Sequence, residues 1–97
     1  MQAKPTMNSF EQVDERQDDA ITLALAKEGA EIRGSVFCPA AIAGGRLPED
    51  QVSAPMPAVD AYRSAIRLAN EIKAPVVVLD PDGLWQAEWG ELYRVEE

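Results

Sequence analysis

Apolar residues recur in steps of three and four along residues 58–73, and this spacing is typical of an amphipathic helix. The apolar stripe consists of Val59, Tyr62, Ile66, Ala69 and Ile72, and Ala65 and Leu68 widen it. The charged side chains fall on the other side: Asp60, Arg63, Arg67, Glu71 and Lys73. Because Pro57 suits the start of a helix and Pro75 disfavours its continuation, the sequence predicts a helix over residues 58–73.

A run of branched apolar residues, Val76-Val77-Val78-Leu79, follows this helix and predicts a buried strand. Asp80-Pro81-Asp82-Gly83 then fits a type I turn, with proline second and glycine last. Beyond the turn, alternate positions are apolar at Trp85, Ala87, Trp89, Tyr93 and Val95, interrupted only by Glu91, although Trp85, Trp89 and Leu92 also have helical spacing. A tight turn between two strands is the frame of a short hairpin, so we expect a C-terminal hairpin over residues 76–95.

The segment before residue 37 supports two interpretations. Ser9 and Gln12 match a helix capping box, and Gly29 can end a helix. The alternation in residues 21–25, followed by a turn at residues 27–29, instead predicts a hairpin with residues 31–37. The alanines at positions 20–26 favour the helix, and the hairpin stays open as the alternative. In both interpretations residues 31–37 form a strand, with Gly34 at a bulge or a close approach.

These elements predict an α+β domain in which a small sheet of about three to four strands packs against the main helix, residues 58–73. With 97 residues, 46% of them hydrophobic, the chain suits one domain with its own core. We expect residues 1–8 to be a flexible terminus, residues 9–97 to form the domain, and residues 38–57 to form a long loop rich in proline and glycine. If strands 31–37 and 76–79 are parallel neighbours, the helix between them is a right-handed crossover.

The chain carries 17 acidic and 9 basic residues, a formal charge of −8. This balance disfavours direct nucleic-acid binding and anionic membranes, because both require clustered basic residues. The acidic run at residues 11–19 leaves open an acidic decoy that imitates nucleic-acid phosphates and inhibits a nucleic-acid-binding protein. The sequence shows no signal peptide and no apolar run of membrane-spanning length, so we expect a cytoplasmic protein.

The absence of histidine removes Ser-His-Asp and Cys-His catalysis and histidine-ligated metals. The one cysteine, Cys38, is expected to be a small buried hydrophobe, and a reactive thiol is the alternative. The glycine-containing tip Gly44-Gly45-Arg46 lacks the Gly-Lys-Ser/Thr ending of a phosphate loop and the context of a dinucleotide site. We therefore expect no cofactor.

Asp80 and Asp82 form the tightest carboxylate pair next to a predicted strand, at the carboxyl end where ligands gather in α/β folds. Hard cations prefer oxygen ligands, so this pair is the candidate metal site, for Mg²⁺. The string Leu79-Asp80-Pro81-Asp82-Gly83-Leu84 resembles the first motif of haloacid-dehalogenase-type phosphatases, which implies a nucleophile at Asp80 and an acid/base at Asp82. The resemblance departs at Leu84, where that family has a hydroxyl residue, and in the short segment after Trp85. The favoured interpretation is that both aspartates serve the turn.

Trp85, Trp89 and Tyr93 are the candidate partner-binding residues, because Trp and Tyr dominate interface hot spots. The alternative places these aromatic side chains in the core. The sequence favours a non-enzymatic protein-interaction or homo-oligomerising module that binds through the aromatic strand or the loop 38–57. The alternatives are the acidic decoy and a small Mg²⁺-dependent or ligand-binding enzyme centred on Asp80 and Asp82, with Arg33 or Arg46 as an anion contact.

Overall fold

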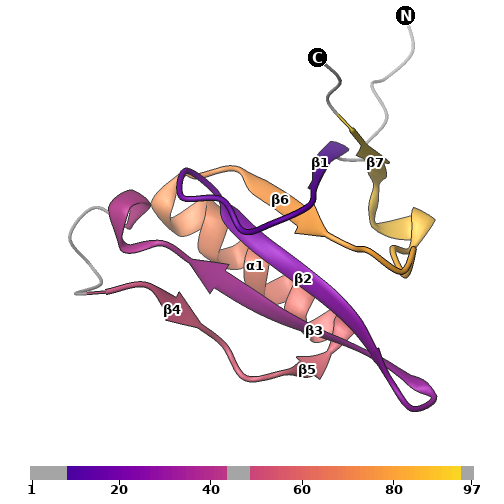
Figure 1. The fold of residues 1–97 in the computed structure, drawn as a ribbon. Coiled ribbons are helices and arrows are strands. Elements are labelled where there is room, and N and C mark those ends of the chain that lie inside the picture. Colours follow the sequence, from indigo (N-terminus) through magenta and orange to yellow (C-terminus); the bar gives the residue numbers. More distant parts are fainter. Residues whose placement is uncertain (1–8, 44–48, 95–97) are drawn as a thin grey trace, which may run out of the picture.

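The computed structural model describes residues 9–43 and 49–94, which form a seven-stranded mixed sheet with one long helix packed on one face (Figure 1). The strands are β1 (Ser9–Val13), β2 (Ile21–Glu28), β3 (Glu31–Cys38), β4 (Gln51–Val52), β5 (Met56–Pro57), β6 (Val76–Leu79) and β7 (Glu91–Tyr93). The helix is α1 (Ala58–Ile72), and two short 3-10 turns are η1 (Ala40–Ile42) and η2 (Ala87–Trp89). The α+β class is therefore confirmed, with a larger sheet than the three to four strands expected.

The strand order is β4-β3-β2-β6-β1-β7, and β5 also pairs with β3. β2 and β3 form an antiparallel hairpin, whereas β2, β6, β1 and β7 run parallel to one another. β5 is antiparallel to β3 and therefore runs in the direction of β6, so α1 is the crossover that connects these two strands. Since β2 lies between β3 and β6, those two strands are not the parallel neighbours considered from the sequence.

The prediction of a helix before Gly29 is wrong. The alternative, a hairpin, is what forms, and its strands are β2 and β3. β2 and β3 pair in continuous register from Thr22 opposite Phe37 to Glu28 opposite Glu31, and Gly29 in the turn has a positive φ of 64°. The central part of β2 is buried on both faces, since Leu23 beneath the helix and Thr22 on the other face are both fully buried. A strand paired on both sides buries this segment more completely than a surface helix, and this tertiary burial outweighs the helix preference of its alanines.

The prediction of a C-terminal hairpin over residues 76–95 is also wrong. β6 and β7 are not paired with each other, because β1 lies between them and is parallel to both. Glu11 is in register with Val77 of β6 and, on its other side, with Tyr93 of β7. The turn at residues 80–83 therefore begins a crossover to the far side of β1, and β7 is only three residues long. The buried strand at residues 76–79 is confirmed, with Val77 and Val78 in the core.

The helix predicted over residues 58–73 is confirmed as α1, which ends at Lys73 in the left-handed conformation. Its buried row differs from the expected apolar stripe and consists of Ala58, Ala61, Ala65 and Ala69. Val59, which was expected to face the core, is 39% exposed. Small side chains in this row let the helix axis lie close to the sheet, so the larger apolar side chains flank the contact.

Gly34 in β3 is the site of closest approach between the helix and the sheet. A Cβ atom at this position would lie 2.8 Å from the Cβ of Ala61 and 3.3 Å from Cδ2 of Leu25. These distances leave no room for a side chain between the two layers. They confirm the close approach expected at Gly34, and they show that alternate residues of β3 from Gly34 face α1.

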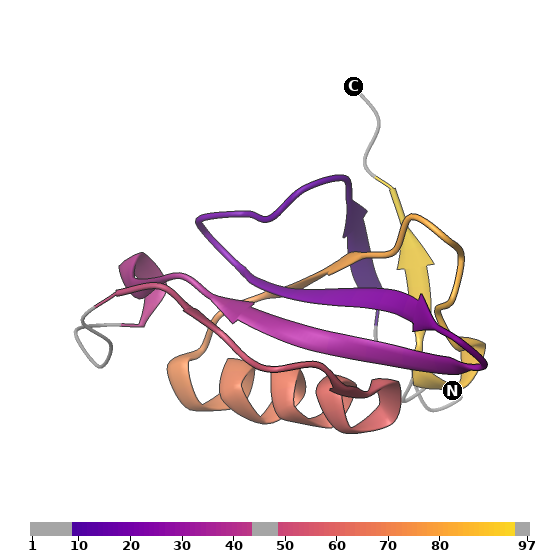
Figure 2. The same cartoon turned by 60° about the horizontal axis from the view of Figure 1, so that its bottom comes forward.

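The other face of the sheet is crossed by residues 14–20, which connect β1 to β2 (Figure 2). The backbone N–H of Gln17 donates to Oγ1 of Thr22 at 3.2 Å. The guanidinium of Arg16 lies 4.9 Å from the ring centroid of Phe37, within the range of a cation–π interaction. Both contacted side chains point away from α1, so this connection partly covers the face that the helix leaves open.

Several expectations concern residues outside the described ranges, namely the flexible terminus at residues 1–8, the loop tip Gly44-Gly45-Arg46 and the strand position of Val95. No helix within residues 9–43 and 49–94 is long and apolar enough to cross a bilayer.

Substituting Gly34→Ala should lower the free energy of unfolding by about 1–3 kcal/mol, because the added methyl group must displace α1 from the sheet. Urea denaturation followed by circular dichroism measures this change. Ala61→Gly in the Gly34→Ala background removes the opposing Cβ and should recover part of the loss, although glycine in a helix costs about 1 kcal/mol. Strictly additive effects of the two substitutions would contradict the proposed contact.

Candidate functional site

Asp80 lies at the carboxyl end of β6 and is almost fully buried, with 2% of its surface exposed. Its Oδ1 accepts the backbone N–H of Leu84 and its Oδ2 that of Trp85, both at 2.8 Å. Its backbone carbonyl accepts a hydrogen bond of 3.0 Å from Nε2 of Gln12. The two bonds to the carboxylate close the turn that follows β6, as the turn interpretation of the sequence expected, and the bond from Gln12 ties β1 to the end of β6.

Asp82 occupies the exposed part of the same turn, and the following Gly83 has a positive φ of 70°. Within residues 9–43 and 49–94, no group of three or more Asp, Glu, Cys or His side chains is arranged to hold a metal ion. Both carboxylate oxygens of Asp80 already accept N–H groups, so a metal at this pair would have to compete with the turn.

The candidate partner-binding residues Trp85 and Trp89 belong to an aromatic cluster that also contains Phe10 and Tyr62. The rings of Tyr62 and Trp89 are stacked, with centroids 5.0 Å apart and planes at 9°. Trp85 packs edge-on against the other three rings, at centroid distances of 5.2 to 5.9 Å. The cluster joins β1, α1 and residues 84–90, three segments that are distant in sequence.

Two hydrogen bonds fix this cluster to the backbone. The hydroxyl of Tyr62 donates to the carbonyl of Trp89, and Nε1 of Trp85 donates to the carbonyl of Gly90, both at 3.0 Å. Both indole rings are half-buried against the core. Tyr93 lies in β7 and is 45% exposed, so its side chain remains available to a partner.

An apolar groove of about 380 Å³ lies between α1 and the edge of the sheet formed by β3, β4 and β5. Its apolar lining comes from Val36, Cys38, Val52, Met56 and Leu68. Three polar residues, Gln51, Ser53 and Ser64, complete the lining. Val52 is 48% exposed, so the groove presents apolar surface to solvent. We call this site the edge groove.

Cys38 is buried in the edge groove, which confirms its expected role as a small hydrophobe. Burial raises the pKa of the thiol, and the negative charge of Asp50 raises it further. The thiol therefore stays protonated at neutral pH and is a poor nucleophile. Asp50 is itself held in place, since its Oδ1 accepts the backbone N–H of Ala40 at 2.8 Å.

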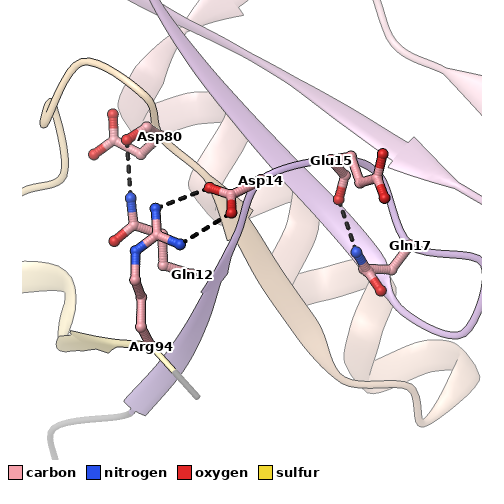
Figure 3. A network of polar contacts seen from close by, with 6 residues as sticks. All are labelled: Gln12, Asp14, Glu15, Gln17, Asp80 and Arg94. Atoms are coloured by element: carbon pink, nitrogen blue, oxygen red, sulfur yellow. Dashed lines mark hydrogen bonds and ion pairs between the residues drawn. The ribbon is translucent and has the colours of Figure 1, made fainter. Parts of the chain in front are cut away.

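A second concave site of about 280 Å³ lies at the carboxyl ends of β1 and β6. Arg94 donates two hydrogen bonds to Asp14 there, of 2.9 and 3.2 Å, next to the bond from Gln12 to Asp80 (Figure 3). The guanidinium of Arg94 lowers the pKa of the Asp14 carboxyl. Sequence reasoning missed these three side chains, because Asp14 and Arg94 are 80 residues apart and carry no local motif.

No protein-family model, curated protein or solved structure matches the chain.

Substituting Asp80→Asn should lower the free energy of unfolding by about 1–3 kcal/mol, because one of two backbone N–H groups loses its acceptor in a buried turn. Equilibrium urea denaturation tests this expectation. Asp82→Asn, in the exposed part of the turn, is the matched control and should change stability by less than about 0.5 kcal/mol. A melting temperature that rises with Mg²⁺ in the unsubstituted chain but not in Asp82→Asn would support the metal site instead.

Arg94→Gln should lower the melting temperature only slightly at neutral pH, because the ion pair is exposed, and this difference should shrink as the solution becomes acidic. Because the folded-state pKa of Asp14 is lowered, the ion pair stabilises the protein above the ordinary carboxyl pKa of 3.8 and is lost as the pH falls through the folded value. Thermal unfolding of both proteins across this pH range measures the effect. In an Asp14→Asn background, Arg94→Gln should show no such pH dependence; an equal dependence there would assign the effect to another group.

Proposed function

We propose that this chain is a non-enzymatic protein-interaction module that binds an apolar side chain of its partner in the edge groove. The observation that carries the proposal is the groove itself, whose lining is mostly apolar and which opens to solvent at Val52. Pockets that bind apolar groups combine such walls with a few polar groups that fix orientation, and Ser64 supplies such a group in the lining. The hydroxyl of Ser53 is already engaged by the backbone N–H of Val36 and the carbonyl of Ala54.

The chemistry around the groove favours binding over catalysis. The chain contains no histidine, and the groove contributes serine, glutamine and a protonated thiol. None of these groups is an effective general base at neutral pH without an activating partner.

The charge of the chain favours a basic partner. Asp50 lies close enough to the groove to raise the pKa of the Cys38 thiol, and Glu49 precedes it. A segment with one apolar anchor flanked by Lys or Arg complements both the groove and this acidic rim. A second copy of the chain fits less well, because each copy carries a formal charge of −8.

Val52→Asp should abolish most binding at the edge groove, because it places a charge on the apolar wall. The neutral fluorescent probe N-phenyl-1-naphthylamine should bind the unsubstituted chain, and Val52→Asp should weaken this binding about tenfold. Val59→Asp is the matched control, since Val59 is also an exposed valine but does not line the groove.

Peptides selected from a random display library on the unsubstituted chain test the partner chemistry. They should carry an apolar residue next to Lys or Arg, and should lose binding to Val52→Asp but keep it to Val59→Asp. Selected peptides that bind both variants equally would contradict the proposal. Concentration-dependent dimerisation that Val52→Asp abolishes would identify a second copy as the occupant and overturn the choice of a foreign partner.

A further inference from the structure

The concave site at the ends of β1 and β6 lies where two connections leave the sheet in opposite directions. Residues 14–20 leave β1 and cross to β2 on the face away from α1, as their contacts with Thr22 and Phe37 show. Residues 80–90 leave β6 and pass β1 on the face that carries α1, where the two tryptophans contact Tyr62. In open sheets of parallel strands, ligands bind outside the carboxyl ends of the strands at such a switch point. We call this site the switch-point crevice.

The crevice combines an apolar wall with three polar side chains. The wall comes from Val13, Leu25, Leu79 and Pro81, and the polar groups belong to Gln12, Asp14 and Arg94. Its volume of about 280 Å³ admits a molecule of the size of a free amino acid. The edge groove shares no lining residue with it, so the two sites are independent.

The charged pair in the crevice is accessible to a ligand. The side chain of Arg94 is 49% exposed and that of Asp14 is 79% exposed. An ion pair this exposed contributes little to the stability of the fold. A ligand can therefore separate the two groups at a small cost in free energy. Gln12 is held by its Nε2 donor bond to the carbonyl of Asp80, which leaves its Oε1 as an acceptor.

We propose that the switch-point crevice binds a small zwitterion with an apolar side chain, which is the chemistry of a free α-amino acid. Its carboxylate accepts hydrogen bonds from Arg94, and its ammonium donates to Asp14. The apolar side chain packs on Leu79 and Pro81. A simple anion would leave the Asp14 carboxylate beside a like charge, and a simple cation would face Arg94 in the same way. Only a ligand with both charges satisfies both side chains.

L-Leucine is the probe for this site, observed by its effect on backbone amide resonances of the full chain. It should shift the amides of residues 12–14, 79, 80 and 94; Pro81 has no amide proton and is followed through its neighbours. Leucinamide lacks the carboxylate and 4-methylpentanoate lacks the ammonium group, so each should bind about tenfold more weakly. Shifts confined to the edge groove, or no shift, would overturn the proposal.

Two variants separate ligand contacts from structural effects. Arg94→Gln should weaken L-leucine binding about tenfold, and Arg94→Lys should recover part of it. Asp14→Asn should reverse the preference, so that 4-methylpentanoate binds more tightly than L-leucine, because the ammonium group of L-leucine then loses its carboxylate partner and lies near the guanidinium of Arg94. Val52→Asp in the edge groove should bind L-leucine unchanged. A ligand preference that Asp14→Asn leaves unaltered would contradict the assignment of charges.

Discussion

The close contact between Gly34 of β3 and Ala61 of α1 is the constraint on which the arrangement of the sheet and the helix depends. The two layers approach until a hypothetical Cβ on the strand would lie 2.8 Å from the helix. A row of alanines on α1 makes this distance attainable, and each of them is buried. The larger apolar side chains are therefore displaced to the two sides of the row. On one side they form the edge groove, and on the other Tyr62 joins the aromatic cluster.

The position of β1 between β6 and β7 organises the other half of the molecule. It makes β6 a central strand, and it requires the chain after Leu79 to pass over β1 before β7 can form. Residues 84–90 of this connection carry the two tryptophans of the aromatic cluster, on the side of the helix. The buried carboxylate of Asp80 stabilises the turn at its start. The switch-point crevice is the space left where this connection and the one from β1 diverge. Topology, rather than any local motif, therefore creates the second candidate site.

Elements specified by local pattern could be predicted, and elements specified by distant partners could not. The helix over residues 58–72, the strand over residues 76–79 and the turn after it follow from periodicity and from proline and glycine placement. The alternation at residues 21–25 also predicted the hairpin. The alanines in this segment favour a helix locally, but pairing with β3 and β6 outweighs that preference. The segment that forms β1 contains only a capping box as a local pattern, and a capping box predicts a helix. Its pairing with β6 and β7 depends on residues that are distant in sequence, which no local pattern specifies. The same limit applies to the pair of Asp14 and Arg94. The packing of Trp85 and Trp89 against the core agrees with the alternative that composition supports for these aromatic residues.

The insertion of β1 also determines the order in which the chain can acquire its structure during synthesis. β1 leaves the ribosome before strands β2 to β7, but the side chain of Gln12 finds its acceptor on a residue 68 positions later. The hairpin of β2 and β3 joins residues that are close in sequence and can form while the rest of the chain is still being made. Until β6 and β7 appear, the apolar ring of Phe10 has none of its aromatic neighbours from residues 84–90. β1 therefore has no strand partner until residues 76–79 have been synthesised, and an unpaired strand edge of this kind is prone to premature association.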